Sequence, residues 1–390
     1  MNWQPKLKVL YEDMVLRIPE MIRPVIKPML LETSEKKCME RNGKSVSEMD
    51  LVVALFEVTP PAFQPTMIED LKILGVNVDL YLPKVNSDFK LNNDLNQMVK
   101  DIQKLCILTE VNFNEKAIWK ALNAFKEFYS GSSLSIRTTT KPVERRDVSV
   151  RYVEMMIPHN PDPYKVALNE GLIEKNGHPI HKMILETLDT FDVMGYGVDI
   201  DARKGFSKIW PFIIPRSINP LFSMKYIPES IKKYEAYFKK HSLTTLALFA
   251  FDFLKNTTNI YFMVKDTSTA TYEKCKTLVE ELGFKPASRE IMESCRNAAH
   301  LNFTFSWDSE KIERLCFGVA CHDVKKVPVH FHPLIQKFVE ESPFQSDIHK
   351  FIYGVTFTPD GMYYKIENDY NGTMVDFLLM GAKAGLEFYT

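Results

Sequence analysis

Hydrophobic and polar residues alternate along residues 145–153, whose sequence is RRDVSVRYV. One parity holds Val148, Val150 and Tyr152, and the other holds Asp147, Ser149 and Arg151. Because successive side chains of a strand point to opposite faces, this alternation predicts a β-strand. In most strands of this kind the apolar face lies in the core and the charged face is solvated. The rest of the chain decides whether that interpretation applies here.

Ten segments of this kind occur in the chain, grouped into five close pairs. The pairs are residues 132–140 with 147–155, 191–201 with 206–214, 243–251 with 258–266, 301–307 with 314–322, and 351–357 with 362–368. Segments with apolar residues near helical spacing lie between the pairs, at residues 161–172, 227–241, 270–283 and 332–343. Hairpin and helix therefore alternate with a period of about fifty to sixty residues, somewhat above that of short solenoid repeats.

Strands joined by short turns are antiparallel, and ten of them with helices between the pairs can close into a barrel. We therefore predict an α+β protein in which residues 96–390 form a ten-stranded antiparallel barrel with helices outside. In such a barrel the apolar faces pack under the helices and the other faces line a lumen. A polar row then no longer indicates an outer surface, and ten strands leave room for a cavity.

Residues 1–95 have a different texture. A helical pattern covers residues 18–42, and a second helix is expected to begin near Ser45-Val-Ser-Glu, where a serine precedes an apolar run as an N-cap does. The proline-containing TPPAFQPTMIEDL follows at residues 59–71. We predict a small helical N-terminal domain and linker here, with a protein partner as one role for it.

Composition and charge narrow the class of protein. The chain has 390 residues and a formal net charge of −1, with 49 Lys and Arg against 50 Asp and Glu, so it lacks the basic field typical of nucleic-acid binding. No apolar run approaches the roughly 18 residues that span a bilayer, and the first residues lack the features of a signal peptide. We expect a soluble, cytoplasmic protein that binds neither nucleic acid nor membrane.

The six cysteines lack the paired spacing of a zinc or redox site and are expected to be small buried residues. A metal site shared by Cys316 and Cys321 is disfavoured, because residues five apart on a strand face opposite sides of the sheet.

The polar parity of the strands gathers a set of charged and aromatic residues in the predicted lumen. The set is Arg137, Asp147, Ser149, Arg151, Asp199, Asp201, Lys208, Trp210, Lys255, Thr257, Asn259, Tyr261, Arg314, Tyr363, Lys365 and Glu367. Six of these are cations, and unpaired buried charges are costly unless a polyanion joins them. A diphosphate is the natural occupant. The aromatic members, with Tyr353 and Tyr370 nearby in sequence, suit a ligand whose other end is apolar or cationic.

A plainer interpretation stays open for each of these residues taken alone. Lysines and arginines at strand edges often remain solvated, and tyrosines often fill cores with one hydrogen-bonded hydroxyl. The joint pattern across five hairpins favours the lumen.

Four stretches carry a resemblance to a known family. They are residues 198–210 (VDIDARKGFSKIW), 258–262 (TNIYF), 311–317 (KIERLCF) and 363–374 (YYKIENDYNGTM), and the upstream DPYKVALNEGL and GHPI fit the same pattern. In order and spacing they resemble the ABBA aromatic prenyltransferases, soluble enzymes built from repeated αββα units around a ten-stranded barrel. The resemblance covers roughly residues 115–390. The N-terminal segment faintly resembles the small helical domain of some light-independent protochlorophyllide reductase subunits, in Trp3, IPEMIRP and SVSEMDLVVAL.

This resemblance implies transfer of a prenyl group from dimethylallyl or geranyl diphosphate to an electron-rich aromatic acceptor, by Friedel-Crafts-type alkylation in the lumen. It implies diphosphate binding by Lys208, Lys255, Asn259, Arg314 and Lys365, to which the lumen pattern adds Arg137 and Arg151. Tyr261 and Tyr370 would shield the allylic chain, in a pocket with Trp210, Tyr353 and Tyr363. Trp210 stands where relatives often have tyrosine, and Asn302 stands where some place a tyrosine that contacts the diphosphate.

Glu367 is the candidate for orienting the acceptor or taking its proton, and a structural pairing with Lys365 is the alternative. Asp147 matches the position where magnesium-dependent relatives hold the metal, whereas Arg151 matches the position where metal-independent relatives place a cation. An arginine can supply fixed charge and a fork of donors to phosphate, with Asp147 as its partner. We therefore expect no cofactor, with Mg²⁺ at Asp147 as the alternative.

Two other functions remain open from the sequence. The barrel could bind a prenyl or diphosphate metabolite without turnover, as a sensor or carrier coupled to the N-terminal segment. It could also act on another diphosphate substrate as a hydrolase, although the chain has no clustered carboxylates of the kind that clamp magnesium diphosphate.

Overall fold

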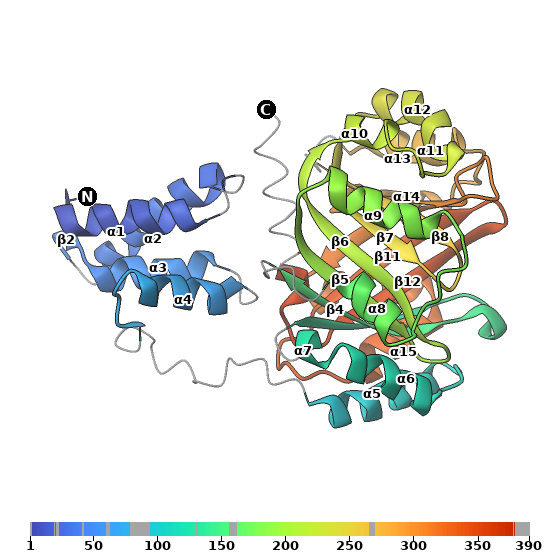
Figure 1. Ribbon diagram of the computed structural model, residues 1–390, viewed down its shortest axis with the longest axis horizontal. Helices are drawn as coiled ribbons and strands as arrows, with labels where there is room; N and C mark the ends of the chain where they lie inside the picture. The colour runs from blue at the N-terminus through green and yellow to red at the C-terminus, as the bar shows by residue number, and fades with distance from the viewer. Residues whose placement is uncertain are drawn as a thin grey trace. The chain divides into compact units, whose positions relative to one another are not determined.

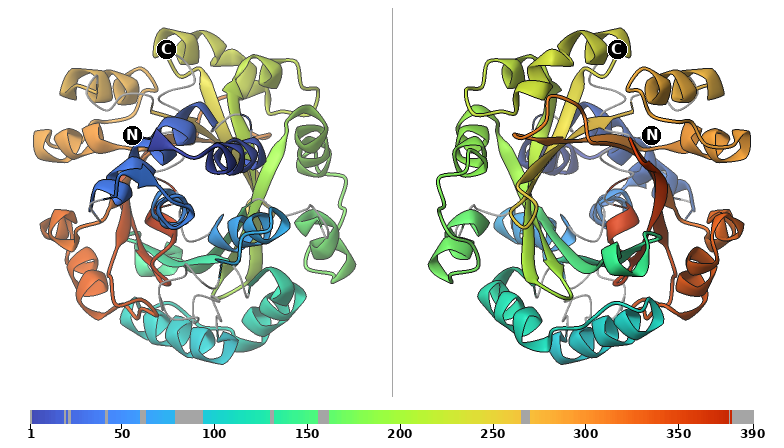
Figure 2. Two further views of the ribbon diagram at one scale, coloured as in Figure 1. Left: turned by 90° about the vertical axis from the view of Figure 1, so that its left-hand side faces the viewer. Right: turned by 90° about the vertical axis from the view of Figure 1, so that its right-hand side faces the viewer.

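Ten antiparallel strands close into one barrel, and each strand pairs with its neighbours in sequence order. The strands are β3 (Ser133–Thr139), β4 (Val148–Met155), β5 (Val193–Asp201), β6 (Gly205–Ser217), β7 (Thr245–Asp252), β8 (Thr257–Met263), β9 (His300–Ser306), β10 (Arg314–Cys321), β11 (Phe351–Thr358) and β12 (Gly361–Asp369). All five predicted hairpins are present. Strand β10 pairs with β11 of the next hairpin, and β12 pairs with β3 to close the barrel. The predicted fold class is confirmed, and Figure 2 shows the strands as a ring with helices outside it.

The computed structural model describes residues 2–18, 20, 23–40, 43–59, 63–78, 94–129, 132–155, 162–264, 270–376 and 378 (Figure 1). The chain divides into two compact units, one within residues 1–92 and the other within residues 93–385. Our prediction from the sequence placed the division at residues 95 and 96. Within the described ranges, no helix is both long enough and apolar enough to cross a membrane.

Helices cover the outside of the barrel (Figure 2). They are α5 (Leu95–Leu108), α6 (Glu115–Ala124), α7 (Lys126–Tyr129), α8 (Pro163–Asn169), α9 (Ile180–Thr190), α10 (Asn219–Phe222), α11 (Glu229–Lys233), α12 (Glu235–Lys240), α13 (Tyr272–Glu280), α14 (Arg289–Ser294) and α15 (Pro333–Glu341). The four helical segments predicted between the hairpins correspond to α8, to α11 and α12, to α13 and to α15. The side chains of Asp94 and Asn114 cap α5 and α6 by accepting backbone N–H bonds.

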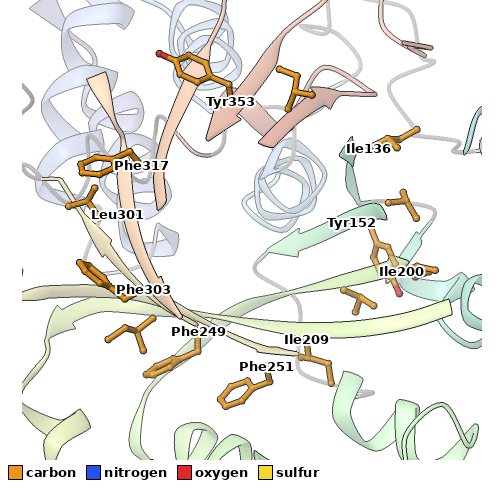
Figure 3. Close-up of a cluster of buried hydrophobic side chains, with 14 of the residues drawn as sticks. Ile136, Tyr152, Ile200, Ile209, Phe249, Phe251, Leu301, Phe303, Phe317 and Tyr353 are labelled. Atoms are coloured by element: carbon orange, nitrogen blue, oxygen red, sulfur yellow. The ribbon is translucent and has the colours of Figure 1, made fainter. Parts of the chain in front are cut away.

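Both faces of the barrel strands are buried, which answers the question that residues 145–153 raise. Val148, Val150 and Tyr152 belong to the hydrophobic core between strands and helices. Ser149, on the opposite parity of β4, is only 3% exposed. Figure 3 shows residues of this outer core, among them Phe249, Phe251 and Phe303. The polar face of the strand is therefore a lumen face and not a solvated surface.

The N-terminal unit has a hydrophobic core of its own. It contains α1 (Pro5–Arg17), α2 (Arg23–Glu40), α3 (Glu48–Val58), α4 (Gln64–Ile73) and a parallel pair of two-residue strands, β1 (Asn2–Trp3) and β2 (Ser45–Val46). The predicted N-cap is confirmed at Ser47, which forms a reciprocal capping box with Asp50. That the unit binds a partner protein stays a prediction.

Helix α4 begins within the proline-containing stretch of residues 59–71, and Pro65 lies in its first turn. A proline in the first turn is compatible with a helix because the N–H groups there have no partner within the helix. Residues 60–62 and 79–93, which fall within the predicted N-terminal domain and linker, lie outside the described residues.

Candidate active site

A cavity opens in the barrel lumen and has a charged side and an apolar side. Its lining includes Arg137, Arg151, Trp210, Tyr261, His300, Asn302, Lys365 and Glu367, together with apolar residues such as Val153, Phe212, Leu248 and Ile352. The lining comes from strands on all sides of the barrel, so that residues far apart in sequence meet in one space. A cavity of mixed character of this kind suits a ligand with one anionic end and one apolar end.

Arg151 is held by two carboxylates. Its Nε atom lies 2.8 Å from Asp199 Oδ1 and its Nη1 atom lies 3.2 Å from Glu367 Oε2. The Ser135 hydroxyl donates a second hydrogen bond to Glu367. Burial would lower the pKa of Arg151, but the two carboxylates raise it above its ordinary value. The predicted pairs of Arg151 with Asp147 and of Glu367 with Lys365 are therefore replaced by a cluster of Arg151, Asp199 and Glu367.

Two further cations on this side also have acidic neighbours. Arg137 donates to the Ser149 hydroxyl at 3.1 Å and lies 4.0 Å from Asp199. Lys208 lies 3.3 Å from Asp252 Oδ2. Burial lowers the pKa of Lys208 to about 8 despite this carboxylate. Lys208 is thus a lumen amine that mild alkali readily deprotonates.

Asp147 faces cations and not Arg151. Its Oδ2 atom lies 3.9 Å from Lys255 Nζ, and its Oδ1 atom accepts a hydrogen bond from Thr139 at 3.0 Å. Burial would raise the pKa of Asp147, but Arg137, Lys141 and Lys255 outweigh it and hold the pKa well below the usual range. Among the residues that the structure describes, no three His, Cys, Asp or Glu side chains gather into a group that could hold a metal ion.

A second group of cations forms no ion pair with a carboxylate of the described residues. No ion pair within the described part of the chain involves Arg314, Lys365 or Lys141, whereas Arg314 hydrogen-bonds to the Tyr363 side chain. The ammonium group of Lys141 lies 4.3 Å from the centre of the Tyr363 ring. Burial would raise the pKa of Tyr363, but Lys365, Arg314 and Lys141 together lower it to about 8. This region therefore has a strong positive potential.

An aromatic wall stands beside the charged groups. The rings of Trp210 and Tyr261 are 5.3 Å apart, and the Arg151 guanidinium lies 4.0 Å from the centre of the Trp210 ring. Tyr261 receives a hydrogen bond from Asn259, its neighbour on the same face of β8. The Nε1 atom of Trp210 is buried without a hydrogen-bond partner among the described residues. These side chains offer electron-rich ring faces to a ligand in the cavity.

The hydroxyl groups of Tyr353 and Tyr370 are directed to outer helices. Tyr353 borders the cavity, but its side chain belongs to the outer core (Figure 3) and its hydroxyl points to the Ser294 carbonyl, 3.5 Å away on α14. The Tyr370 hydroxyl donates to Asp101 on α5 at 2.7 Å. The hydroxyl groups of both tyrosines therefore join strands to outer helices. Tyr353 lines the cavity as predicted, whereas the predicted place of Tyr370 in the pocket is corrected.

Two lumen residues were missed from the sequence. His300 lies at the start of β9 and lines the cavity, with its ring 5.5 Å from that of Tyr261. Lys141 follows β3 and points its charge at Tyr363. A simple signal could have found both, because His300 shares the parity of Asn302 and Lys141 shares the parity of Arg137. The six cysteines are all buried thiols, as predicted.

Comparison with known proteins gives a consistent result. The family model described as aromatic prenyltransferase Orf2 matches residues 93–382. The chain is 31% identical over 250 residues to the 5,10-dihydrophenazine-1-carboxylate 9-dimethylallyltransferase of Streptomyces anulatus, covering 63% of this chain and 83% of that protein. It is 25% identical over 281 residues to the flaviolin linalyltransferase of Streptomyces virginiae, covering 71% and 92% of the two chains.

Proposed function

The chain belongs to the aromatic prenyltransferase Orf2 family and is a prenyltransferase, and from this premise we propose that its reaction takes place in the lumen cavity. The donor is an allylic diphosphate and the acceptor is a small, electron-rich aromatic molecule. The observation that carries the proposal is the group of unpaired cations, Arg314, Lys365 and Lys141, around Tyr363. Lys365 lines the same cavity as the aromatic wall of Trp210 and Tyr261. A diphosphate supplies the negative charge that these cations lack.

The same arrangement suits ionisation of the donor. When the bond between C1 and oxygen breaks, negative charge grows on the diphosphate and positive charge on the allylic carbons. Fixed lysine and arginine groups stabilise the first charge without reorganising. Aromatic faces stabilise the second by roughly 0.5 to 2 kcal/mol each. The acceptor ring then attacks C1 in a Friedel-Crafts-type step and loses a proton.

We assign the diphosphate to Arg314, Lys365 and Lys141, flanked by Lys208, Lys255 and Asn259. Arg151 and Arg137 serve it less directly, because their charge is partly offset by Asp199 and Glu367. The Glu367 carboxylate, engaged by Arg151 and Ser135, holds this cluster in place. The short-chain donors dimethylallyl and geranyl diphosphate fit the relatives, whose names specify dimethylallyl and linalyl transfer.

We further propose that the reaction is independent of a metal ion. Asp147 is the carboxylate that Mg²⁺ would use, and its charge is already offset by Lys255, Arg137 and Lys141. A divalent cation at Asp147 would have to approach these groups against their repulsion. The lysines and arginines supply instead the charge that a metal would otherwise bring to the diphosphate.

Incubation with dimethylallyl or geranyl diphosphate and a panel of dihydroxynaphthalenes, phenols, indoles and phenazines, followed by mass spectrometry, tests the proposal. We expect an acceptor heavier by one prenyl unit, formed equally in EDTA and in magnesium. Activity only with magnesium would assign Asp147 to a metal. Thermal stabilisation by the donor without any product across the panel would favour a binding protein instead.

A further inference from the structure

His300 and Lys365 mark the ends of a row that crosses four neighbouring strands. In the strand register His300 on β9 pairs with Gly318 on β10, Gly318 pairs with Gly354 on β11, and Gly354 pairs with Lys365 on β12. Two glycines therefore lie between two long polar side chains at one level of the barrel. Because neither glycine has a side chain, His300 lies over Gly318, and Cys316 and Lys365 lie over Gly354.

The His300 ring lies directly over Gly318. A Cβ atom on Gly318 would be 2.2 Å from Nε2 and 2.3 Å from Cε1 of that ring. Gly318 is not among the glycines with positive φ, so its backbone does not require glycine. Glycine at position 318 therefore leaves room for the imidazole to lie along the wall of the cavity.

The imidazole is partly buried, and its neutral form is favoured. Burial lowers its pKa to about 4, and the charges of Lys365 and Arg151 contribute to that shift. Its ring lies 5.5 Å from that of Tyr261 in the aromatic wall. No residue within the described ranges forms a hydrogen bond with either ring nitrogen. A neutral imidazole has one nitrogen that accepts a hydrogen bond, and the His300 side chain lines the cavity.

We propose that His300 binds the aromatic acceptor by accepting a hydrogen bond from a hydroxyl or N–H group conjugated with its ring, and takes that proton as the ring attacks the donor. This inference rests on the proposed function and adds to it a requirement on the acceptor, which must carry an O–H or N–H group conjugated with its ring. Aromatic compounds whose only oxygen is a methyl ether lack the proton that His300 accepts.

His300 is better placed for this role than Glu367. Both oxygens of Glu367 lie 3.2 Å from Arg151 Nη1, and one also accepts from Ser135, so protonating this carboxylate would break a buried ion pair. His300 has no such partner to lose. The acceptor's proton can therefore move to the imidazole without disturbing the charged cluster.

The proton and electron balance of the step is simple. The C1–O bond of the donor breaks, and its electron pair leaves with the diphosphate. Two π electrons of the acceptor ring form the new C–C bond while the O–H or N–H proton passes to His300. The ring carbon then gives its own proton to water, and His300 returns its proton to the oxygen or nitrogen. One proton is released for each prenyl group transferred.

The position of Lys365 couples this step to donor binding. While the diphosphate is absent, the positive charges of Lys365 and Arg151 oppose protonation of His300. A diphosphate bound to Lys365 offsets part of that charge, so the imidazole becomes a better base when the donor is in place. His300 therefore takes up a proton more readily in the complex that contains the donor than in the free enzyme.

Four variants test the proposal: His300→Ala, His300→Gln, Gly318→Ala and the double variant H300A/G318A. We expect His300→Ala to lower kcat about 100-fold, within the range for loss of a general base, with unchanged affinity for inorganic pyrophosphate. His300→Gln keeps a hydrogen-bonding group and should keep the acceptor KM but not kcat. Gly318→Ala displaces the imidazole and should resemble His300→Ala, whereas adding it to His300→Ala should cost little more.

The outcomes separate this inference from the proposed function. If wild type forms product and all four variants do so at the same rate, the role of His300 is wrong and the prenyltransferase site stands. If wild type forms no product with any acceptor, the proposed function itself fails and this inference fails with it. Should His300→Ala not fold, Gly318→Ala and His300→Gln decide the matter, with pyrophosphate binding and circular dichroism as the checks on folding.

Discussion

Two partly buried arginines in the same lumen differ in what surrounds them. Arg151 is bracketed by Asp199 and Glu367, whereas Arg314 has Tyr363 as its hydrogen-bonding neighbour and no ion pair within the described residues. A buried cation with its own carboxylates is satisfied whether or not a ligand is bound. A buried cation without them is satisfied only when an anion arrives. The comparison separates cations that stabilise the folded lumen from cations that are available to bind the substrate.

The same contrast explains why the lumen can carry so much charge. The outer faces of the strands are packed with aliphatic and aromatic side chains that stabilise the barrel through burial. The lumen face contributes little of this apolar packing on its charged side, where burial disfavours the charged forms of Arg314 and Lys141. The large outer core offsets this cost, and a diphosphate that binds here supplies further negative charge.

Arg314→Ala is the largest expected effect on activity. Loss of one preorganised charge at the leaving group should lower kcat/KM by about 100- to 1,000-fold. The free energy of unfolding should change less than in Arg151→Ala, because Arg314, unlike Arg151, forms no ion pair within the described residues. Steady-state kinetics and urea unfolding measure the two quantities. Arg314→Lys is the matched control, which keeps the charge but loses the guanidinium fork, and should recover part of the activity.

Arg151→Ala should have the opposite profile and lower stability most. It leaves Asp199 and Glu367 buried without their main cation, which costs about 3–5 kcal/mol when a buried pair is broken. Urea unfolding measures this loss, and the triple variant R151A/D199N/E367Q should recover a part of it. Should Arg151→Ala unfold at the wild-type urea concentration yet lose all activity, Arg151 would belong with Arg314 among the ligand-binding cations.

Tyr363 should report the positive potential around Arg314 directly. Its folded pKa of about 8 lies below the ordinary value of 10.0, so its ionisation stabilises the fold as pH rises from 8 to 10. This stabilisation is complete above pH 10 and is lost as pH falls below 8. A shift of this size corresponds to about 2–3 kcal/mol at most. The tyrosinate absorbance band should appear near pH 8 in wild type, and Tyr363→Phe should lack it.

Inorganic pyrophosphate provides the control for the Tyr363 titration. Bound pyrophosphate competes with the phenolate for the same cations, so it should move the absorbance transition to higher pH. Lys208 loses its charge in the same pH range but does not absorb there, so it affects pyrophosphate affinity and not the absorbance change. A Tyr363 that titrates near pH 10 with and without pyrophosphate would mean that the field around Arg314 is weak.

The sequence predicted the barrel and most of the lumen because one rule covers every strand. Alternation assigns each residue to a face, and ten strands in five hairpins leave a closed barrel as the arrangement that covers both faces. Lys208, Tyr261, Arg314 and Lys365 were placed by that rule. The partners of the charges could not be found in this way, since Arg151 meets Glu367 from a strand 216 positions away in sequence.

The errors concern residues that were assigned from the family resemblance or from nearness in sequence, and not from the alternation of strand faces. Gly354 and Ile352 pair with the lumen residues Lys365 and Glu367, so Tyr353 between them faces outward while still lining the cavity. Asp369 shares the parity of Lys365 and Glu367, so Tyr370, the next residue, has the outward parity. His300 was missed because the predicted strand began one residue later, at Leu301. In each case the strand register contained the answer, but it needed exact strand ends that sequence patterns do not provide.

The smallest expected effect tests the corrected place of Tyr370. Tyr370→Phe removes the hydroxyl that donates to the buried Asp101 at 2.7 Å, and a lost hydrogen bond to a charged group costs about 1.5–3 kcal/mol of stability. The ring remains in the outer core, so activity per folded molecule should not change. Tyr353→Phe is the matched control, because its 3.5 Å contact with the Ser294 carbonyl is long and should be worth less. Equal unfolding free energies with a fall in kcat for Tyr370→Phe alone would return Tyr370 to the lumen, since a tyrosine that only ties a strand to α5 has no route to the reacting atoms.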